Sequence, residues 1–138
     1  MSKNERTRWR DLRLNDRHRL WGTDSPAVDI DHFLEFDGGH PAILVEYKNE
    51  LAEEPNPKHP SYQALIELAD RAGLPILFVR YASDFSWWLV TPWNSQAKKW
   101  LNEQTKMGEV DYVRLLYKIR GRRVPEEVLL EISAVVRV

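Results

Sequence analysis

Apolar and polar positions along the chain predict a series of short strands and helices. Residues 41–45 form an apolar, partly β-branched run that is typical of a buried strand. Two glycines, Gly38 and Gly39, precede this run and can supply the positive φ angles that a two-residue turn requires. Residues 27–48 are therefore predicted as a hairpin. Short apolar runs at 74–81 and 87–91 predict two further strands.

Helical spacing of apolar residues appears on both sides of these strands. Ser61 is predicted as the N-cap of a helix over residues 62–72, which Gly73 ends. The three prolines in residues 49–60 predict a loop before it. Further helices are predicted at residues 4–19, 95–106 and 109–120, with a final helix or strand over 128–138.

The predicted hairpin places charged residues on one face. Counting outward from the two-glycine turn puts Glu46 opposite Asp31 and Lys48 opposite Asp29. Because side chains two apart on a strand share a face, all four are expected on the same side and His32 on the other. A β-bulge near the turn would exchange the two faces.

This group of charges has a chemical and a structural explanation. Hard divalent cations take oxygen ligands and are often held by one or two carboxylates, so Asp31 and Glu46 are candidate ligands. Lys48 beside them could orient an attacking water or stabilise developing negative charge. The structural alternative is an exposed strand face with cross-strand ion pairs, such as Asp29 with Lys48, worth about 0–1 kcal/mol.

Charge and cysteine content narrow the function classes. The net charge is −1, yet residues 1–19 carry seven Lys and Arg against three acids, and residues 24–54 carry nine acids against one lysine. Basic flanks beside a metal site would suit a phosphate backbone. The absence of cysteine excludes disulfides, a cysteine nucleophile and a thiolate zinc site, and fits a reducing cytoplasm. No apolar run approaches the length of a membrane helix.

An aspartate, a hairpin and then Glu-x-Lys at the end of an apolar strand resemble the PD-(D/E)XK nuclease superfamily. That family has a core of a helix, a three-stranded antiparallel meander, a helix and a further strand. The resemblance implies Mg²⁺- or Mn²⁺-dependent hydrolysis of a DNA phosphodiester, with Asp31, Glu46 and the Tyr47 carbonyl as ligands. It implies that Lys48 activates water. Asp29 remains open as a second ligand, a partner for Lys48 or a surface acid.

The resemblance extends to other positions and leaves alternatives. Glu5 on the first helix and Gln63 on the helix after Lys48 match further family positions loosely. The fold expected is α/β and restriction-endonuclease-like: one domain over 1–138, with a core over 4–93 and a helical extension over 94–138. The alternatives are an inactive nuclease-fold module and an interaction protein, and a homodimer or a larger partner stays open. Candidate nucleic-acid contacts are Arg10, Arg13, Arg17, Arg19, Arg122 and Arg123.

Overall fold

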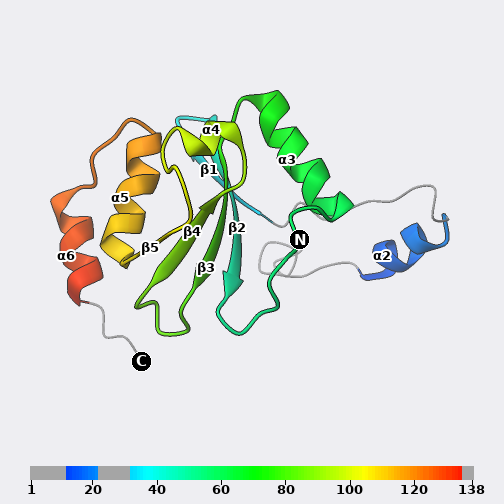
Figure 1. Ribbon diagram of the computed structural model, residues 1–138, viewed down its shortest axis with the longest axis horizontal. Coiled ribbons are helices and arrows are strands. Elements are labelled where there is room, and N and C mark those ends of the chain that lie inside the picture. Colours follow the sequence, from blue (N-terminus) through cyan, green and yellow to red (C-terminus); the bar gives the residue numbers. More distant parts are fainter. Residues whose placement is uncertain (1–11, 22–31, 135–138) are drawn as a thin grey trace, which may run out of the picture.

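The computed structural model describes residues 12–21 and 32–134 of the chain, and these residues form a mixture of strands and helices (Figure 1). The hairpin, the loop after it and the helix–strand unit that follows lie where the sequence predicts them. The elements are α2 (Leu12–Arg19), β1 (Phe33–Asp37), β2 (His40–Asn49), α3 (Pro60–Ala72), β3 (Ile76–Tyr81), β4 (Trp88–Pro92), α4 (Ser95–Lys98), β5 (Thr105–Met107), α5 (Glu109–Ile119) and α6 (Glu126–Ala134).

Five strands form one mixed sheet in the order β1-β2-β3-β4-β5. Strand β2 pairs antiparallel with β1 and parallel with β3, and α3 makes the connection between the two parallel strands. Strand β4 then pairs antiparallel with both β3 and β5. The predicted α/β class, a mixed sheet flanked by helices, is confirmed.

Helices cover both faces of this sheet. On one face α3 packs Leu65 and Ala69 against Leu44 and Ile76. On the other face α5 packs against a second cluster that includes Ile43, Val45, Val79 and Val90. Figure 1 shows α3 on one side of the strands and α5 with α6 on the other. Side chains that alternate along β2 therefore enter two different environments.

The register of the hairpin differs from the uninterrupted count. Asp37 pairs with His40 as counted, but Phe33 pairs with Val45, because the register shifts between Glu35 and Phe36. Ala42 is the additional residue on β2, next to Pro41, which has no N–H for a ladder hydrogen bond. The uninterrupted count, which places Phe33 opposite Leu44, is therefore wrong by one position on β2, and His32, just before β1, lies next to Glu46. Asp31, which the same count places opposite Glu46, lies outside the described residues.

The start of α3 also differs from prediction. His59, not Ser61, is the N-cap, and its Nδ1 accepts a hydrogen bond from the Ser61 N–H at 3.2 Å. Pro60 follows at the first helical position, where a missing N–H costs nothing. Gly73 ends the helix as predicted, in the left-handed conformation at φ 71°.

The region after residue 94 is not wholly helical. Residues 95–106, predicted as one helix, form the short α4 and then β5, which extends the sheet. The expected helical extension over 94–138 therefore includes a strand of the central sheet. Helix α5 lies close to its predicted bounds, and Tyr112 is its buried residue.

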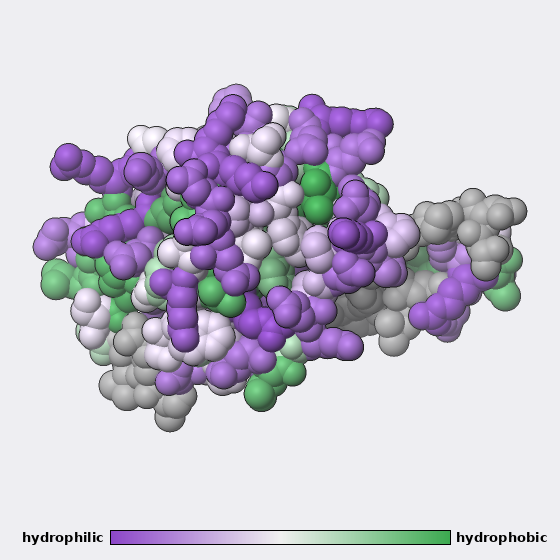
Figure 2. All heavy atoms as spheres, viewed as in Figure 1, coloured by the Kyte–Doolittle hydropathy of each residue, from purple (hydrophilic) through white to green (hydrophobic). Residues whose placement is uncertain are grey.

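The surface combines polar and apolar areas. Figure 2 shows hydrophilic side chains over much of the viewed face, with apolar ones gathered on the side of α6. Along the edge strand β1, Phe33, Leu34 and Phe36 remain 62%, 49% and 62% exposed. Across the described part of the chain, no helix has the length and apolar character needed to cross a membrane.

Candidate functional site

Glu46 is the one buried acidic residue among those the structure describes, at 8% exposure. It lies on β2, between β1 and β3, two residues after Leu44 and therefore on the face that α3 covers. Removing a carboxylate from water is costly unless hydrogen bonds or charges compensate it. The contacts of Glu46 therefore decide what this face of the sheet can do.

Asn94, the other buried polar residue, has a side chain whose loss of contact with water is fully compensated by hydrogen bonds. Its Oδ1 accepts from the N–H groups of Ile76 and Ala97 at 3.2 and 2.9 Å. Its Nδ2 donates to the Asp70 carboxylate and the Leu74 carbonyl at 3.0 and 2.8 Å. These four bonds join the start of β3 to α4, which gives Asn94 a structural role.

Glu46 has one hydrogen-bond donor among the described residues, the hydroxyl of Tyr62. Tyr62 on α3 donates to Oε2 at 3.1 Å, and its ring packs edge-on against Trp93. Burial first, and the neighbouring Glu46 second, raise the pKa of the Tyr62 phenol. The phenol therefore stays protonated and donates, and it holds Oε2 in place while Oε1 remains turned toward β1.

His32 lies on the other side of the Glu46 carboxylate. Its Nε2 is 3.8 Å from Oε1, and its side chain is only 4% exposed, against 11% for Glu46. Both ring nitrogens are buried, and neither has a hydrogen-bond partner among the described residues. Because buried polar atoms are nearly always satisfied, the surroundings of this imidazole bear on the function of this face.

Lys48 follows Glu46 on the same strand. It pairs in register with Arg80 of β3, and because it is two residues from Glu46 it shares the α3-covered face. Its side chain is half-buried. Lys48 and Glu46 are thus on one face as predicted.

Several predicted site residues lie outside the described part of the chain or away from this face. Asp29, Asp31, Glu5 and Arg10 are outside the described residues. The exposed Gln63 donates to the Pro57 carbonyl at 2.8 Å, which ties the loop to α3.

The predicted nucleic-acid contacts are scattered over the surface. Arg13, Arg17 and Arg19 are exposed on α2, and Arg19 pairs with Asp16 at 3.1 Å. Arg122 donates twice to Asp37, next to the hairpin turn, and this lowers the pKa of the Asp37 carboxyl. Arg123 is exposed. In the described residues, these arginines do not form one group with Glu46.

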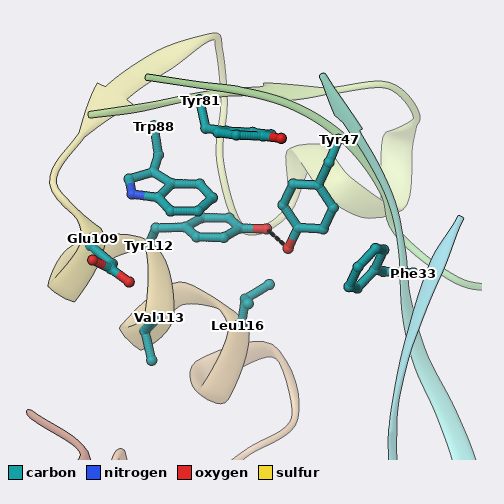
Figure 3. Close-up of a pocket in the computed structure, with 8 residues that line it drawn as sticks. All are labelled: Phe33, Tyr47, Tyr81, Trp88, Glu109, Tyr112, Val113 and Leu116. Carbon is teal, nitrogen blue, oxygen red and sulfur yellow. Dashed lines mark hydrogen bonds between the residues drawn. The ribbon is translucent and has the colours of Figure 1, made fainter. Parts of the chain in front are cut away.

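The opposite face of the sheet holds an aromatic pocket of about 400 Å³ (Figure 3). Tyr47, which points away from Glu46, meets Tyr112 of α5 there through their hydroxyls, 2.5 Å apart. Trp88 stacks on Tyr112 with ring centroids 5.1 Å apart and an interplanar angle of 10°. Burial raises the pKa of Tyr47 to about 12, and it raises the pKa of Tyr112 as well.

Sequence reasoning missed His32 and Tyr62. His32 was assigned to the wrong face because the count omitted the bulge, for which Pro41 beside an apolar run was an available signal. Tyr62 lies three residues before Leu65, so helical periodicity could have placed it toward the sheet.

The described residues thus place a buried carboxylate, an imidazole without hydrogen bonds and a lysine on one face. Within residues 12–21 and 32–134, no three His, Cys, Asp or Glu side chains gather as a metal-binding group. Comparison with family models, with curated proteins and with solved structures finds no match for this chain.

Proposed function

We propose that this chain is a metal-dependent nuclease of restriction-endonuclease-like fold that hydrolyses DNA phosphodiesters. The observation that carries the proposal is Glu46. This residue is 8% exposed on a central strand, and its carboxylate has one hydrogen-bond donor at 3.1 Å and an imidazole at 3.8 Å. A buried acid that is only partly compensated is more typical of a functional site than of a structural one.

The order of elements supports the same assignment. The hairpin β1-β2, the helix α3 and the parallel strand β3 correspond to the last two meander strands, the helix and the further strand of the PD-(D/E)XK core. Glu46 and Lys48 lie on the second of these strands, where that family carries its Glu-x-Lys. The correspondence is one of topology and residue type.

The oxygen and nitrogen atoms around Glu46 could act as ligands of a divalent cation. Oε2 is engaged by Tyr62, and among the described residues no hydrogen bond is found for Oε1 or for the two nitrogens of His32. Glu46 would hold the metal together with Asp31 or Asp29, and with the Tyr47 carbonyl as the resemblance implies. A bound Mg²⁺ or Mn²⁺ would supply Lewis acidity to the scissile phosphate and lower the pKa of a water.

The lysine has a separate task in this proposal. Lys48 projects on the Glu46 face from the same rigid strand, so its ammonium can orient the attacking water or stabilise the developing charge on the phosphate. The partial burial of Lys48 restricts its motion and positions the charge. The exposed arginines of α2 are candidates for holding the DNA backbone.

The test is a cleavage assay with a matched pair of variants. End-labelled single-stranded, duplex and branched DNA, and RNA, are incubated with Mg²⁺, Mn²⁺ or EDTA. Glu46→Gln removes the ligand charge but keeps the shape, and Glu53→Gln makes the same change at an exposed loop position. We expect metal-dependent cutting of DNA by the wild type and Glu53→Gln, and a loss of about a hundredfold or more in Glu46→Gln.

Two results would contradict the proposal. The first is that no substrate is cut with either metal while calorimetry detects no Mn²⁺ binding. The second is equal cutting by wild type and Glu46→Gln, which would assign the activity to a contaminant. Mn²⁺ or DNA binding without cutting would instead favour the inactive nuclease-fold module.

A further inference from the structure

The nuclease proposal cites the buried imidazole of His32 beside Glu46 but assigns it no role at the metal. The His32 side chain is 4% exposed, and within the described part of the chain neither Nδ1 nor Nε2 has a hydrogen-bond partner. A neutral imidazole buried in this way loses its bonds to water at one donor and one acceptor, and each unsatisfied group destabilises the folded chain. Placing His32 opposite Glu46 therefore lowers the stability of the folded chain unless a partner binds the imidazole.

The separation of His32 from Glu46 suggests what is missing. At 3.8 Å, Nε2 and Oε1 are too far apart for a direct hydrogen bond. Two ligand atoms that bind one metal at about 2.1 Å each lie about 3.0–3.4 Å apart at octahedral or tetrahedral angles. The observed distance is close to that range, so a small side-chain adjustment would let one cation contact both atoms.

We propose that His32 is a nitrogen ligand of the metal that Glu46 holds, and that it shifts the preference of the site from Mg²⁺ toward later transition metals. This inference rests on the proposed function. The bulge at Ala42 is what makes it possible, because it places His32 next to Glu46. The PD-(D/E)XK resemblance assigns no role to this position.

The preference follows from ligand chemistry. Mg²⁺ takes oxygen ligands and keeps several of its waters, whereas imidazole suits metals such as Co²⁺, Ni²⁺ and Zn²⁺. Replacing one oxygen ligand by His32 therefore strengthens binding of Co²⁺ far more than binding of Mg²⁺. Tyr62 supports this arrangement, since its bond to Oε2 leaves Oε1 facing His32.

The competing explanation is a plain ion pair between a protonated His32 and Glu46. Such a pair needs no metal. If it were the correct explanation, replacing the imidazole would not change the affinity for Co²⁺ more than the affinity for Mg²⁺. A nitrogen bound directly to the metal distinguishes the two explanations without reference to activity.

The first experiment is pulsed EPR on the full-length chain loaded with Mn²⁺. We expect a nitrogen hyperfine coupling in the wild type that changes when histidine alone is labelled with ¹⁵N. The coupling should be absent in His32→Asn and retained in His40→Asn, which alters an exposed histidine at the start of β2. Circular dichroism checks that each variant folds, and His32→Gln provides a second replacement of different length.

The second experiment is calorimetry with Co²⁺ and Mg²⁺ on the same proteins. His32→Asn should lower Co²⁺ affinity by about tenfold or more and change Mg²⁺ affinity by less than about threefold. Metal binding without a histidine coupling in the labelled wild type would overturn the role of His32 and leave the nuclease proposal intact. Equal losses for both metals would also overturn it, and no metal binding at all would remove both proposals.

Discussion

The hydroxyls of Tyr47 and Tyr112 join β2 to α5 in the aromatic pocket, 2.5 Å apart. Tyr112 is only 3% exposed, so ionising its phenol would place a negative charge in a desolvated pocket. Desolvation is the largest cause of the raised pKa of both groups. The packing of α5 on β2 is therefore most stable when both tyrosines are neutral.

We expect the free energy of unfolding to fall as pH rises from about 10 toward 12. Tyrosine in the unfolded chain ionises near pH 10, whereas Tyr47 in the folded chain keeps its proton up to about 12. Below the unfolded value both states are protonated and the contribution is fully present. The slope should be about 1.4 kcal/mol per pH unit for each such phenol.

Urea denaturation across this pH window measures the slope. Tyr47→Phe should make it shallower, because one of the two buried phenols is then absent. Stability that stays level over the window in the wild type would contradict the assignment.

For single residues, the sequence predicts that Glu46 and Lys48 share a face, and the structure confirms this, but it does not predict which side chains surround them. Glu-x-Lys can be recognised in the sequence because its two charged residues stand at the end of an apolar run that is typical of a buried strand. No comparable sequence pattern distinguishes His32 or Tyr62. Their relation to Glu46 depends on register and on helix packing, which a linear pattern determines only in part.

Among the elements, the β1-β2 hairpin determines which side chains meet Glu46. Its two-glycine turn has positive φ at both Gly38 and Gly39, at 57° and 81°, as predicted. The additional residue at Ala42 then moves every pair beyond it by one position on β2. The two-glycine turn could be predicted from the sequence. The bulge could not, because it depends on how Pro41 fits at the end of the strand pairing.

Cross-linking tests this register, because the chain has no cysteine of its own. The double variant Leu34→Cys/Leu44→Cys should form a disulfide, since these residues are directly opposite and such pairs have Cα atoms about 4.5–5.5 Å apart. Phe33→Cys/Leu44→Cys, the pair that the uninterrupted count predicts, should stay reduced because its side chains project to opposite faces. Mass spectrometry and thiol titration measure both, and cross-linking of the second pair alone would contradict the bulge.

Over the whole molecule, the α/β class and the order of hairpin, helix and strand could be predicted because each buried strand is a distinct apolar run. Strand β5 could not, because Thr105–Met107 is three residues long and two of them are polar. Its place in the sheet comes from pairing with β4 rather than from its own pattern. Asp29 and Asp31 lie outside the described residues, so their ranking as ligands stays a prediction.

Lys48 offers the most direct test of the proposal that the Glu46 face cuts DNA with a metal-activated water. Lys48→Ala removes the ammonium two residues from Glu46, and Lys58→Ala removes one from an exposed loop position as a control. Cleavage of labelled DNA in Mn²⁺ should fall about a hundredfold or more in Lys48→Ala and stay near wild type in Lys58→Ala, with Mn²⁺ affinity little changed in both. Metal-dependent cutting at the wild-type rate by Lys48→Ala would contradict the account.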